Sequence, residues 1–177
     1  MAKLYVIRHG QTEWNAQNRV CGRADIPLDE AGVAQARAAA VQLRGMHLER
    51  VIASPLMRAR QTAQLLLEES GIALSIEIDA RIIEQDFGSF DGLDRAEESF
   101  RQQRRQAPLR QGGGESAFDV VHRVYSLLDE LRADQRDVLL VCHGAVSRAI
   151  RSYFVSMTDG EYFYYLAGNC ELVEYEF

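Results

Sequence analysis

The chain has 177 residues, of which 47% are apolar, and its formal net charge at pH 7 is −6. This length predicts a single domain, residues 1–177, with a core that needs no disulfide or metal to hold it together. The negative charge argues against nucleic acid or an anionic membrane surface as the main partner, because those contacts rely on surplus Lys and Arg.

Cysteine spacing and apolar patterning favour an intracellular setting. Cys21, Cys142 and Cys170 are odd in number and lack the spacing of a metal finger, so we expect reduced thiols. The N-terminus leads straight into a short strand-like run, and no apolar segment approaches the roughly 18 residues of a membrane span. The sequence therefore predicts a cytoplasmic protein.

The first fifteen residues predict a strand, a glycine turn and the start of a helix. Residues 4–7 are apolar and stop at Arg8-His9-Gly10, after which Thr12 is the expected helix N-cap. Open α/β sheets bind ligands at the carboxyl ends of their strands, where a helix N-terminus also presents unpaired N–H groups. This stretch predicts an anion site that contains Arg8 and His9.

A loop and a long helix come next. Residues 19–28 are polar and broken by Gly22 and Pro27, which predicts a loop. Asp29 is the expected N-cap of an alanine-rich helix that runs to about Arg44. This helix is assigned to packing.

A second strand-to-helix unit begins at residue 50. Residues 50–54 predict a strand, with Ser54 as the N-cap and Pro55 as the first residue of the helix that follows. Helix geometry places Arg58 within the first turn, close to the end of the strand. Arg60 is assigned to the solvated face.

The middle of the chain contains a third strand and a long polar stretch. Residues 74–79 alternate apolar and polar side chains, which predicts the strand, and Glu84 lies in the glycine-rich loop after it. The arginine-rich segment 93–114 is either a solvated helix, which we favour, or a lid whose arginines contact a substrate. Its three glycines, 112–114, form a hinge-like break.

The C-terminal part repeats the same design. Residues 116–132 predict an amphipathic helix, and residues 137–142 a strand that delivers His143 to the same edge as His9. The aromatic run 161–165 is assigned to core packing, with a homodimer contact as the alternative, and a terminal edge strand follows it. Three such units predict an α/β fold, a three-layer sandwich with a mostly parallel central sheet flanked by helices.

Four motifs within these units resemble the signature of one family. They are Arg-His-Gly-x-Thr-x-x-Asn at residues 8–15, Ser-Pro-Leu-x-Arg-Ala-x-Gln-Thr-Ala at 54–63, Glu-x-x-x-Gly-x-x-x-Gly at 84–92 and His-Gly at 143–144. On these residues the chain resembles the histidine phosphatase superfamily, also called the phosphoglycerate mutase-like family. The resemblance covers nearly the whole chain except residues 93–111, and it implies the phosphoglycerate mutase-like form of the sandwich.

The resemblance also implies catalytic roles. His9 attacks phosphorus and forms a covalent phosphohistidine. Arg8 and Arg58 bind the phosphate dianion with their guanidinium forks, and His143 stabilises the equatorial oxygens of the transition state. Glu84 is the expected proton donor, because His143 is followed by glycine and alanine rather than by the aspartate that serves this role in other members.

Smaller contributions complete the implied phosphate site. Asn15, together with Gln11 and Thr12, is expected to line the phosphate cradle. No metal or other cofactor is expected, because arginine and histidine already supply the positive charge that a metal ion supplies elsewhere. Lys3 is the only lysine among the 20 basic residues, so no P-loop lysine is present.

These residues predict a phosphatase that hydrolyses a small phosphorylated metabolite. The alternative is phosphoglycerate mutase-type phosphoryl transfer, which the short separation of Glu84 and His143 disfavours because mutases carry a longer insertion there. A catalytically silent phosphate-binding module is a third interpretation. A metallohydrolase built on His9, Cys142 and His143 is disfavoured, because adjacent strand residues point to opposite faces.

Overall fold

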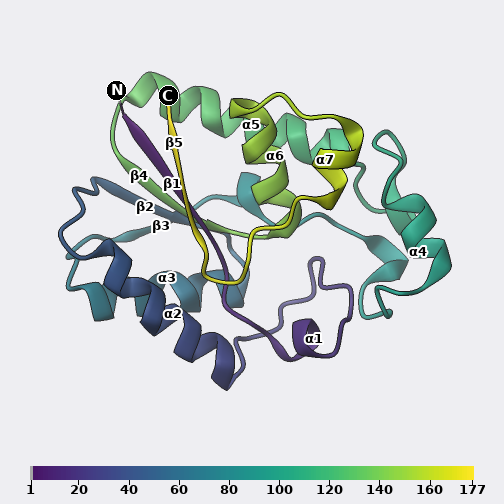
Figure 1. The fold of residues 1–177 in the computed structure, drawn as a ribbon, viewed down its shortest axis with the longest axis horizontal. Coiled ribbons are helices and arrows are strands. Elements are labelled where there is room, and N and C mark those ends of the chain that lie inside the picture. The colour runs from purple at the N-terminus through teal and green to yellow at the C-terminus, as the bar shows by residue number, and fades with distance from the viewer. Residues whose placement is uncertain (1) are drawn as a thin grey trace.

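A five-stranded sheet forms the middle layer of the protein (Figure 1). The computed structural model describes residues 2–177. The strand order is β3-β2-β4-β1-β5, and the last strand pairs antiparallel with β1 while all other pairs are parallel. The strands are β1 (Lys3–Arg8), β2 (Arg50–Ala53), β3 (Ile76–Ile78), β4 (Val138–Cys142) and β5 (Leu172–Glu176).

Helices cover both faces of this sheet. The pair α2 (Glu30–Leu43) and α3 (Met57–Ser70) packs on one face, and α5 (Ala117–Asp134) and α6 (Gly144–Phe154) pack on the other (Figure 1). The predicted three-layer α/β sandwich is thus confirmed. Short elements gather beyond the carboxyl ends of the parallel strands: α1 (Glu13–Ala16), α4 (Glu98–Gln103), α7 (Asp159–Tyr164) and the 3₁₀ turns η1 (Ala80–Ile82), η2 (Gly88–Phe90) and η3 (Gln111–Gly113).

The alternation of side chains along β1 explains why its sequence is continuously apolar. Leu4 and Val6 pack with α5 and α6, whereas Tyr5 and Ile7 pack with α2 and α3. A strand buried on both faces has no solvent side on which to carry polar residues. The strand ends at Arg8, which lies opposite Cys142 of β4.

Most predicted elements are present with small shifts of their ends. Asp29 caps α2 by accepting a hydrogen bond from the Gly32 N–H at 2.7 Å. Ser116 and Asp119 form a reciprocal capping box at the start of α5. The third strand is shorter than predicted, and the terminal strand lies at the sheet edge as expected.

The prediction for the start of α3 is wrong. The helix begins at Met57 with Leu56 as its N-cap, so Ser54, whose hydroxyl accepts the Leu56 N–H at 3.3 Å, lies before it. The reason is tertiary, because the carboxylate of Asp25 in the first loop accepts the Met57 N–H at 2.6 Å and takes the place of a local cap. Ser54 is left to contact another element.

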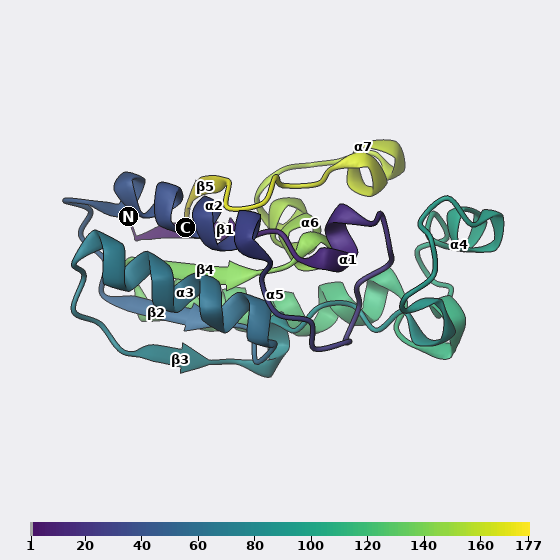
Figure 2. The same ribbon diagram turned by 90° about the horizontal axis from the view of Figure 1, so that it is seen from below.

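The arginine-rich segment 93–114 is only partly helical. Its helix α4 is six residues long and is anchored by Phe100, which packs edge-on against Phe87 and Phe90. Figure 2 shows α4 extending beyond the end of the sandwich. Mobility of this segment as a lid stays a prediction.

The aromatic run near the C-terminus divides between core and surface. Phe163 of α7 is buried, as the prediction of core packing requires, whereas Tyr164 is 72% exposed.

The three cysteines are free and buried. Within residues 2–177 no helix is both long enough and apolar enough to cross a bilayer.

Candidate active site

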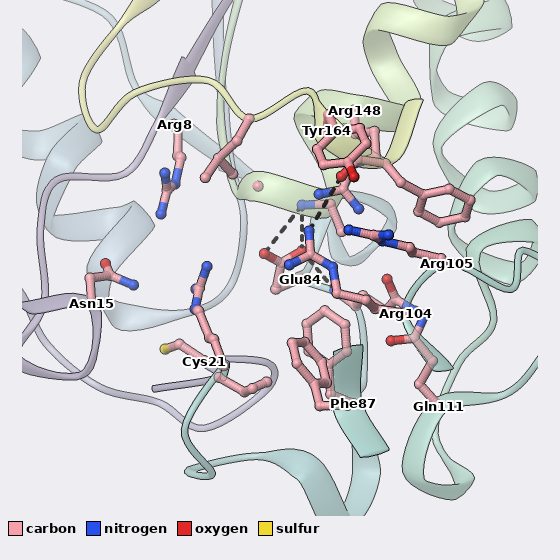
Figure 3. Close-up of a pocket in the computed structure, with 18 of the residues that line it drawn as sticks. Arg8, Asn15, Cys21, Glu84, Phe87, Arg104, Arg105, Gln111, Arg148 and Tyr164 are labelled. Carbon is pink, nitrogen blue, oxygen red and sulfur yellow. Dashed lines mark hydrogen bonds between the residues drawn. The ribbon is translucent and has the colours of Figure 1, made fainter. Parts of the chain in front are cut away.

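The carboxyl ends of β1, β2 and β4 bring the predicted site residues to one edge of the sheet. A cavity of about 180 Å³ lies there (Figure 3). This volume fits a small metabolite rather than a folded partner. Among the predicted site residues, those that line it are Arg8, His9, Asn15 and Glu84.

His9 is held in one tautomer by its neighbours. Its Nδ1 lies 2.7 Å from the carbonyl oxygen of Gly10, and its Nε2 lies 3.2 Å from the Nε of Arg58. The carbonyl accepts only and the guanidinium donates only, so the proton is on Nδ1 and the lone pair is on Nε2. Burial, followed by the charges of Arg58 and Arg8, holds the pKa of His9 well below its usual value. His9 is therefore a neutral imidazole with a nucleophilic Nε2.

Arg58 is fully buried and is fixed by the first loop. Its Nη1 donates to the carbonyl of Ala24 and its Nη2 donates to the carbonyl of Gly22, both at 2.8 Å. Arg58 thus reaches His9 from a position set by two backbone carbonyls.

The loop that holds Arg58 is itself held by Asp91. The carboxylate of Asp91 accepts the N–H groups of Gly22, Arg23 and Ala24 at 3.0 to 3.3 Å. Burial raises the pKa of Asp91 above its ordinary value, although these backbone hydrogen bonds oppose the shift. The role of Asp91 is a tertiary one that the sequence did not reveal, apart from its place among the glycines of residues 84–92.

The ring of His143 packs beside that of His9, with centroids 5.1 Å apart, and His143 itself is not among the described residues that line the cavity. Its Nε2 lies 2.6 Å from the hydroxyl of Ser54, which accepts a hydrogen bond from the Leu56 N–H at 3.3 Å. That hydroxyl can donate its own proton to Nε2, which places the imidazole proton on Nδ1, an atom without a hydrogen-bond partner among residues 2–177. Burial and then the charge of Arg58 hold the pKa of His143 well below its usual value.

Arg8 and Asn15 form the side of the cavity next to His9. Arg8 is anchored by one hydrogen bond from Nη1 to the carbonyl of Ala167 at 2.9 Å. Burial, and next the charge of Arg95, lowers the pKa of Arg8 to about 10, so the guanidinium is still charged near neutral pH. Asn15 Oδ1 accepts the N–H of Thr12, which leaves its amide nitrogen to bind an anion.

Two residues predicted to line the phosphate cradle lie outside the cavity. Thr12 is fully buried, and its hydroxyl accepts the N–H of Asn15 to cap α1. The side chain of Gln11 turns toward the start of α2 and donates to Asp29 at 3.1 Å. Their predicted phosphate contacts stay predictions, and the geometry assigns both residues to supporting the turn.

Glu84 lies in the cavity wall at the N-terminus of α6. Its Oε1 accepts the N–H of Gln85 at 2.9 Å and the N–H of Ala145 at 3.2 Å, and the residue is 7% exposed. It is the only carboxylate that lines the cavity among the described residues.

The backbone around Glu84 is fastened by Arg123, another residue that sequence reasoning did not single out. Arg123 donates to the carbonyls of Arg81 at 2.6 Å and Glu84 at 3.3 Å, so it holds both ends of the short segment before the carboxylate. Glu115 pairs with Arg123 at 3.0 Å and also accepts the Asp86 N–H. On the sequence, Arg123 is one polar residue among several on an amphipathic helix, so no local signal marks it.

The side of the cavity away from His9 is rich in arginine. Arg104 and Arg148 donate to the carbonyls of Phe163 and Tyr165 respectively, each at 3.3 Å. Burial lowers the pKa of both guanidinium groups from their ordinary value. Three arginines line this side, and within residues 2–177 none of them is paired with a carboxylate: Arg104, Arg105 and Arg148. Arg95 also lines the cavity, and its charge acts on Arg8 and His9.

Two neutral histidines thus lie among buried arginines, and the comparison with protein families agrees with the predicted family. The model of the histidine phosphatase superfamily (branch 1) matches residues 4–177. The chain belongs to this superfamily, as its four motifs predicted.

Two relatives that are similar in sequence are named as phosphoglycerate mutases. A 2,3-bisphosphoglycerate-dependent phosphoglycerate mutase of Methylobacterium radiotolerans is 35% identical over 173 residues, which cover 89% of this chain and 81% of that protein. A probable phosphoglycerate mutase of Yersinia pestis is 35% identical over 154 residues, or 81% of this chain and 70% of that protein.

Two solved structures share the fold closely. A mycobacterial glucosyl-3-phosphoglycerate phosphatase is 30% identical with a TM-score of 0.85, and the match covers 98% of this chain and 89% of that one. A phosphoserine phosphatase of Entamoeba histolytica, in complex with 3-phosphoglyceric acid, is 25% identical with a TM-score of 0.83, covering 98% and 90%. The chain is thus similar to enzymes that transfer or hydrolyse phosphoryl groups.

Proposed function

We propose that the protein hydrolyses a small phosphomonoester through a covalent phosphohistidine at His9. The observation that carries this proposal is the tautomer of His9. Its proton is committed to the Gly10 carbonyl, its Nε2 lone pair lies beside Arg58, and its ring borders the cavity. A buried neutral imidazole whose lone pair accepts one guanidinium N–H is suited to attack an electrophile that carries negative charge, because that charge draws the N–H away from the nitrogen.

The first half-reaction forms the phosphohistidine. The phosphate lies against Arg8 and the amide of Asn15. The Arg58 Nε–H turns from Nε2 of His9 to a phosphoryl oxygen, and the released lone pair of Nε2 attacks phosphorus as the bond to the ester oxygen breaks. Glu84, in its protonated form, gives its proton to the departing alkoxide. The products are the free alcohol, the phosphohistidine and the Glu84 carboxylate.

The second half-reaction restores the enzyme. The Glu84 carboxylate takes a proton from a water molecule, whose oxygen attacks phosphorus as the bond to Nε2 breaks. Inorganic phosphate leaves, and His9 recovers its lone pair. One carboxyl group thus serves as acid and then as base.

His143 and the arginines stabilise the charge that develops on the phosphoryl oxygens. The Nδ1–H of His143 has no protein acceptor among the described residues, so it is available to donate to a phosphoryl oxygen. Fixed donors in a buried site need little reorganisation during the reaction, which makes them more effective than water.

A mutase is the second candidate, and it is favoured by the mutase names of the relatives at 35% identity. A mutase must shelter its phosphohistidine from water until a second oxygen of the substrate accepts the phosphoryl group. The short separation of Glu84 and His143 leaves little chain to provide that shelter, and the two solved relatives described above are named as phosphatases. We therefore place hydrolysis first.

The substrate is proposed to be a small anionic phosphomonoester. The substrates in the relatives' names include phosphoglycerate and its glucosyl derivative, and phosphoserine, all of which carry a carboxylate besides the phosphate. Arg104, Arg105 and Arg148, on the side of the cavity away from His9, suit a substrate with that charge.

A screen of phosphate release over phosphoglycerates, phosphoserine, sugar phosphates and nucleotide monoesters tests the proposal. It is run beside a mutase assay on 3-phosphoglycerate, with His9→Ala as the inactive control. Release without interconversion supports the phosphatase. Interconversion faster than release supports the mutase instead.

Activity is expected to survive a chelator, because guanidinium and imidazole groups supply the positive charge in this mechanism.

A further inference from the structure

Gln111 is a buried amide that borders the cavity without a partner. Its side chain is 1% exposed, and its Oε1 has no hydrogen-bond donor within reach among residues 2–177. No hydrogen bond of its amide nitrogen is found in the described part of the chain either. Buried amides are nearly always satisfied, because an unmet polar atom lowers stability. The catalytic steps above make no use of this residue.

The backbone that carries Gln111 is locked in place. A Cβ on Gly112 would come within 2.3 Å of the Phe87 carbonyl oxygen, and a Cβ on Gly114 within 2.3 Å of the Asp86 carbonyl oxygen. Gly112 also has a φ of +55°, which side chains with a Cβ rarely adopt. Segment 111–114 therefore lies directly on the loop after Glu84, and this packing fixes the position of Gln111 in the cavity wall.

Gln111 faces the leaving group rather than the phosphate. In Figure 3, Arg8 and Asn15 occupy one side of the cavity, and Gln111 and Arg105 occupy the other. With phosphorus next to His9, the alcohol part of the ester extends toward Gln111.

The surrounding charges decide which chemical group can satisfy this amide. Its Oε1 needs a donor, which an ammonium or a hydroxyl can supply. Arg104, Arg105 and Arg148 on this side of the cavity oppose an ammonium by charge repulsion. A hydroxyl is neutral, and it can donate to the oxygen or accept from the nitrogen, so it satisfies the amide in either orientation.

We propose that Gln111 binds a hydroxyl group on the alcohol part of the substrate and so selects hydroxylated phosphomonoesters. The proposal rests on the proposed function, because it takes the phosphate to lie at His9. Gln111 is then a specificity residue: its unpartnered amide lowers the stability of the free enzyme and gains a hydrogen-bond partner when the substrate binds.

Three substrates with one carbon skeleton test this selection. They are 3-phosphoglycerate, phosphoserine and 3-phosphooxypropanoate, which carry a hydroxyl, an ammonium and a hydrogen at the same carbon. The pair sorbitol 6-phosphate and hexyl phosphate extends the comparison to a longer chain. The wild type is expected to have the highest kcat/KM for the hydroxylated member, by about tenfold for one neutral hydrogen bond.

The variant Gln111→Met keeps the length of the side chain and removes its polar atoms. In this variant we expect the hydroxylated and the non-hydroxylated substrates to have about the same kcat/KM. We also expect its melting temperature to equal or exceed that of the wild type, because the unmet amide is gone. Gln106→Met, a substitution at an exposed position of the arginine-rich segment 93–114, is the matched control and is expected to retain the wild-type preference and melting temperature.

The proposal is overturned if the wild type shows no preference in the trio and none in the pair. It is also overturned if Gln111→Met keeps the preference, or if it lowers the melting temperature and slows all substrates equally, which a structural role predicts. Failure of the proposed function looks different, since no substrate would then release phosphate in a His9-dependent manner.

Discussion

The position of one proton decides what His9 can do. With Nδ1 bound to the Gly10 carbonyl, Nε2 faces Arg58, and the same cation that lowers the pKa of His9 lies beside the attacking nitrogen. A protonated His9 would carry no lone pair and would repel Arg58 and Arg8. Burial, together with the two guanidinium groups, thus keeps the imidazole of His9 neutral.

Glu84 is the residue whose role is most open to a direct test. An alkyl alkoxide leaves poorly without a proton, whereas a nitrophenolate needs little or none. Glu84→Gln is therefore expected to slow alkyl phosphates by roughly 10²- to 10⁴-fold and aryl phosphates far less, as measured in single turnovers.

Asp86 supplies the control for that measurement. It lies two residues away, its carboxylate accepts the Gly88 N–H at 2.8 Å, and it does not line the cavity. Asp86→Asn is expected to leave the ratio of alkyl to aryl rates unchanged. An alkyl-selective defect in Asp86→Asn, together with equal slowing of both esters in Glu84→Gln, would assign the proton donor to Asp86.

At the scale of the elements, the position of His9 is set in part by Asp91, which is far from it in the sequence. Asp91 accepts three backbone N–H groups of the first loop, that loop's carbonyls hold Arg58, and Arg58 contacts His9. Each step is a hydrogen bond between different segments, so a change at Asp91 is expected to act through Arg58.

The substitution Asp91→Asn tests this chain of contacts. An asparagine offers one acceptor oxygen and turns an NH₂ group toward backbone donors, so the loop shifts, and kcat/KM is expected to fall by up to about 10²-fold. The double variant with Arg58→Gln should be no slower than Arg58→Gln alone. Independent, multiplying losses in the two variants would mean that Asp91 does not act through Arg58.

Strand-to-helix units are readable in the sequence because their signals are local. The apolar run that ends at Arg8 predicts both the strand and the edge where His9 emerges, and residues 137–142 do the same for His143. Ser54 was misassigned because a carboxylate from another loop, Asp25, competes for the helix start. The function of Ser54, to orient His143, depends on β2 and β4 being neighbours in the sheet.

Long-range contacts are the part that the sequence does not reveal. Arg123 and Asp91 support Glu84 and Arg58 from other segments, and neither belongs to a pattern that marks such a role. Gln111 is similar, since its burial follows from glycines that allow two loops to pack backbone to backbone. The motif residues at the carboxyl edge of the sheet were predictable from the sequence, whereas those that position them required the fold.

For the whole molecule, two buried neutral histidines make stability depend on pH. His9 and His143 have pKa values well below 6.5 in the folded state, so below pH 6.5 the unfolded chain binds protons that the native state does not. The contribution of the two histidines to the free energy of unfolding is therefore fully present above pH 6.5. It falls as the pH drops below 6.5, by up to about 1.4 kcal/mol per pH unit for each histidine.

Urea unfolding between pH 7.5 and 5.5 measures this slope in a range where most carboxylates stay ionised. His9→Gln should reduce the slope by about half, whatever its effect on the absolute stability. A wild-type stability that stays constant across this range would show that the two imidazoles are not held neutral by the fold.

The central claim is that His9 carries the phosphoryl group during turnover. The most direct measurement is to mix the enzyme briefly with a substrate that bears a radiolabelled phosphoryl group, quench in alkali and map the label. The account predicts acid-labile, base-stable label on His9 in the wild type and none in His9→Ala, which also loses turnover. Label on a serine or cysteine, or turnover that persists in His9→Ala, would contradict it.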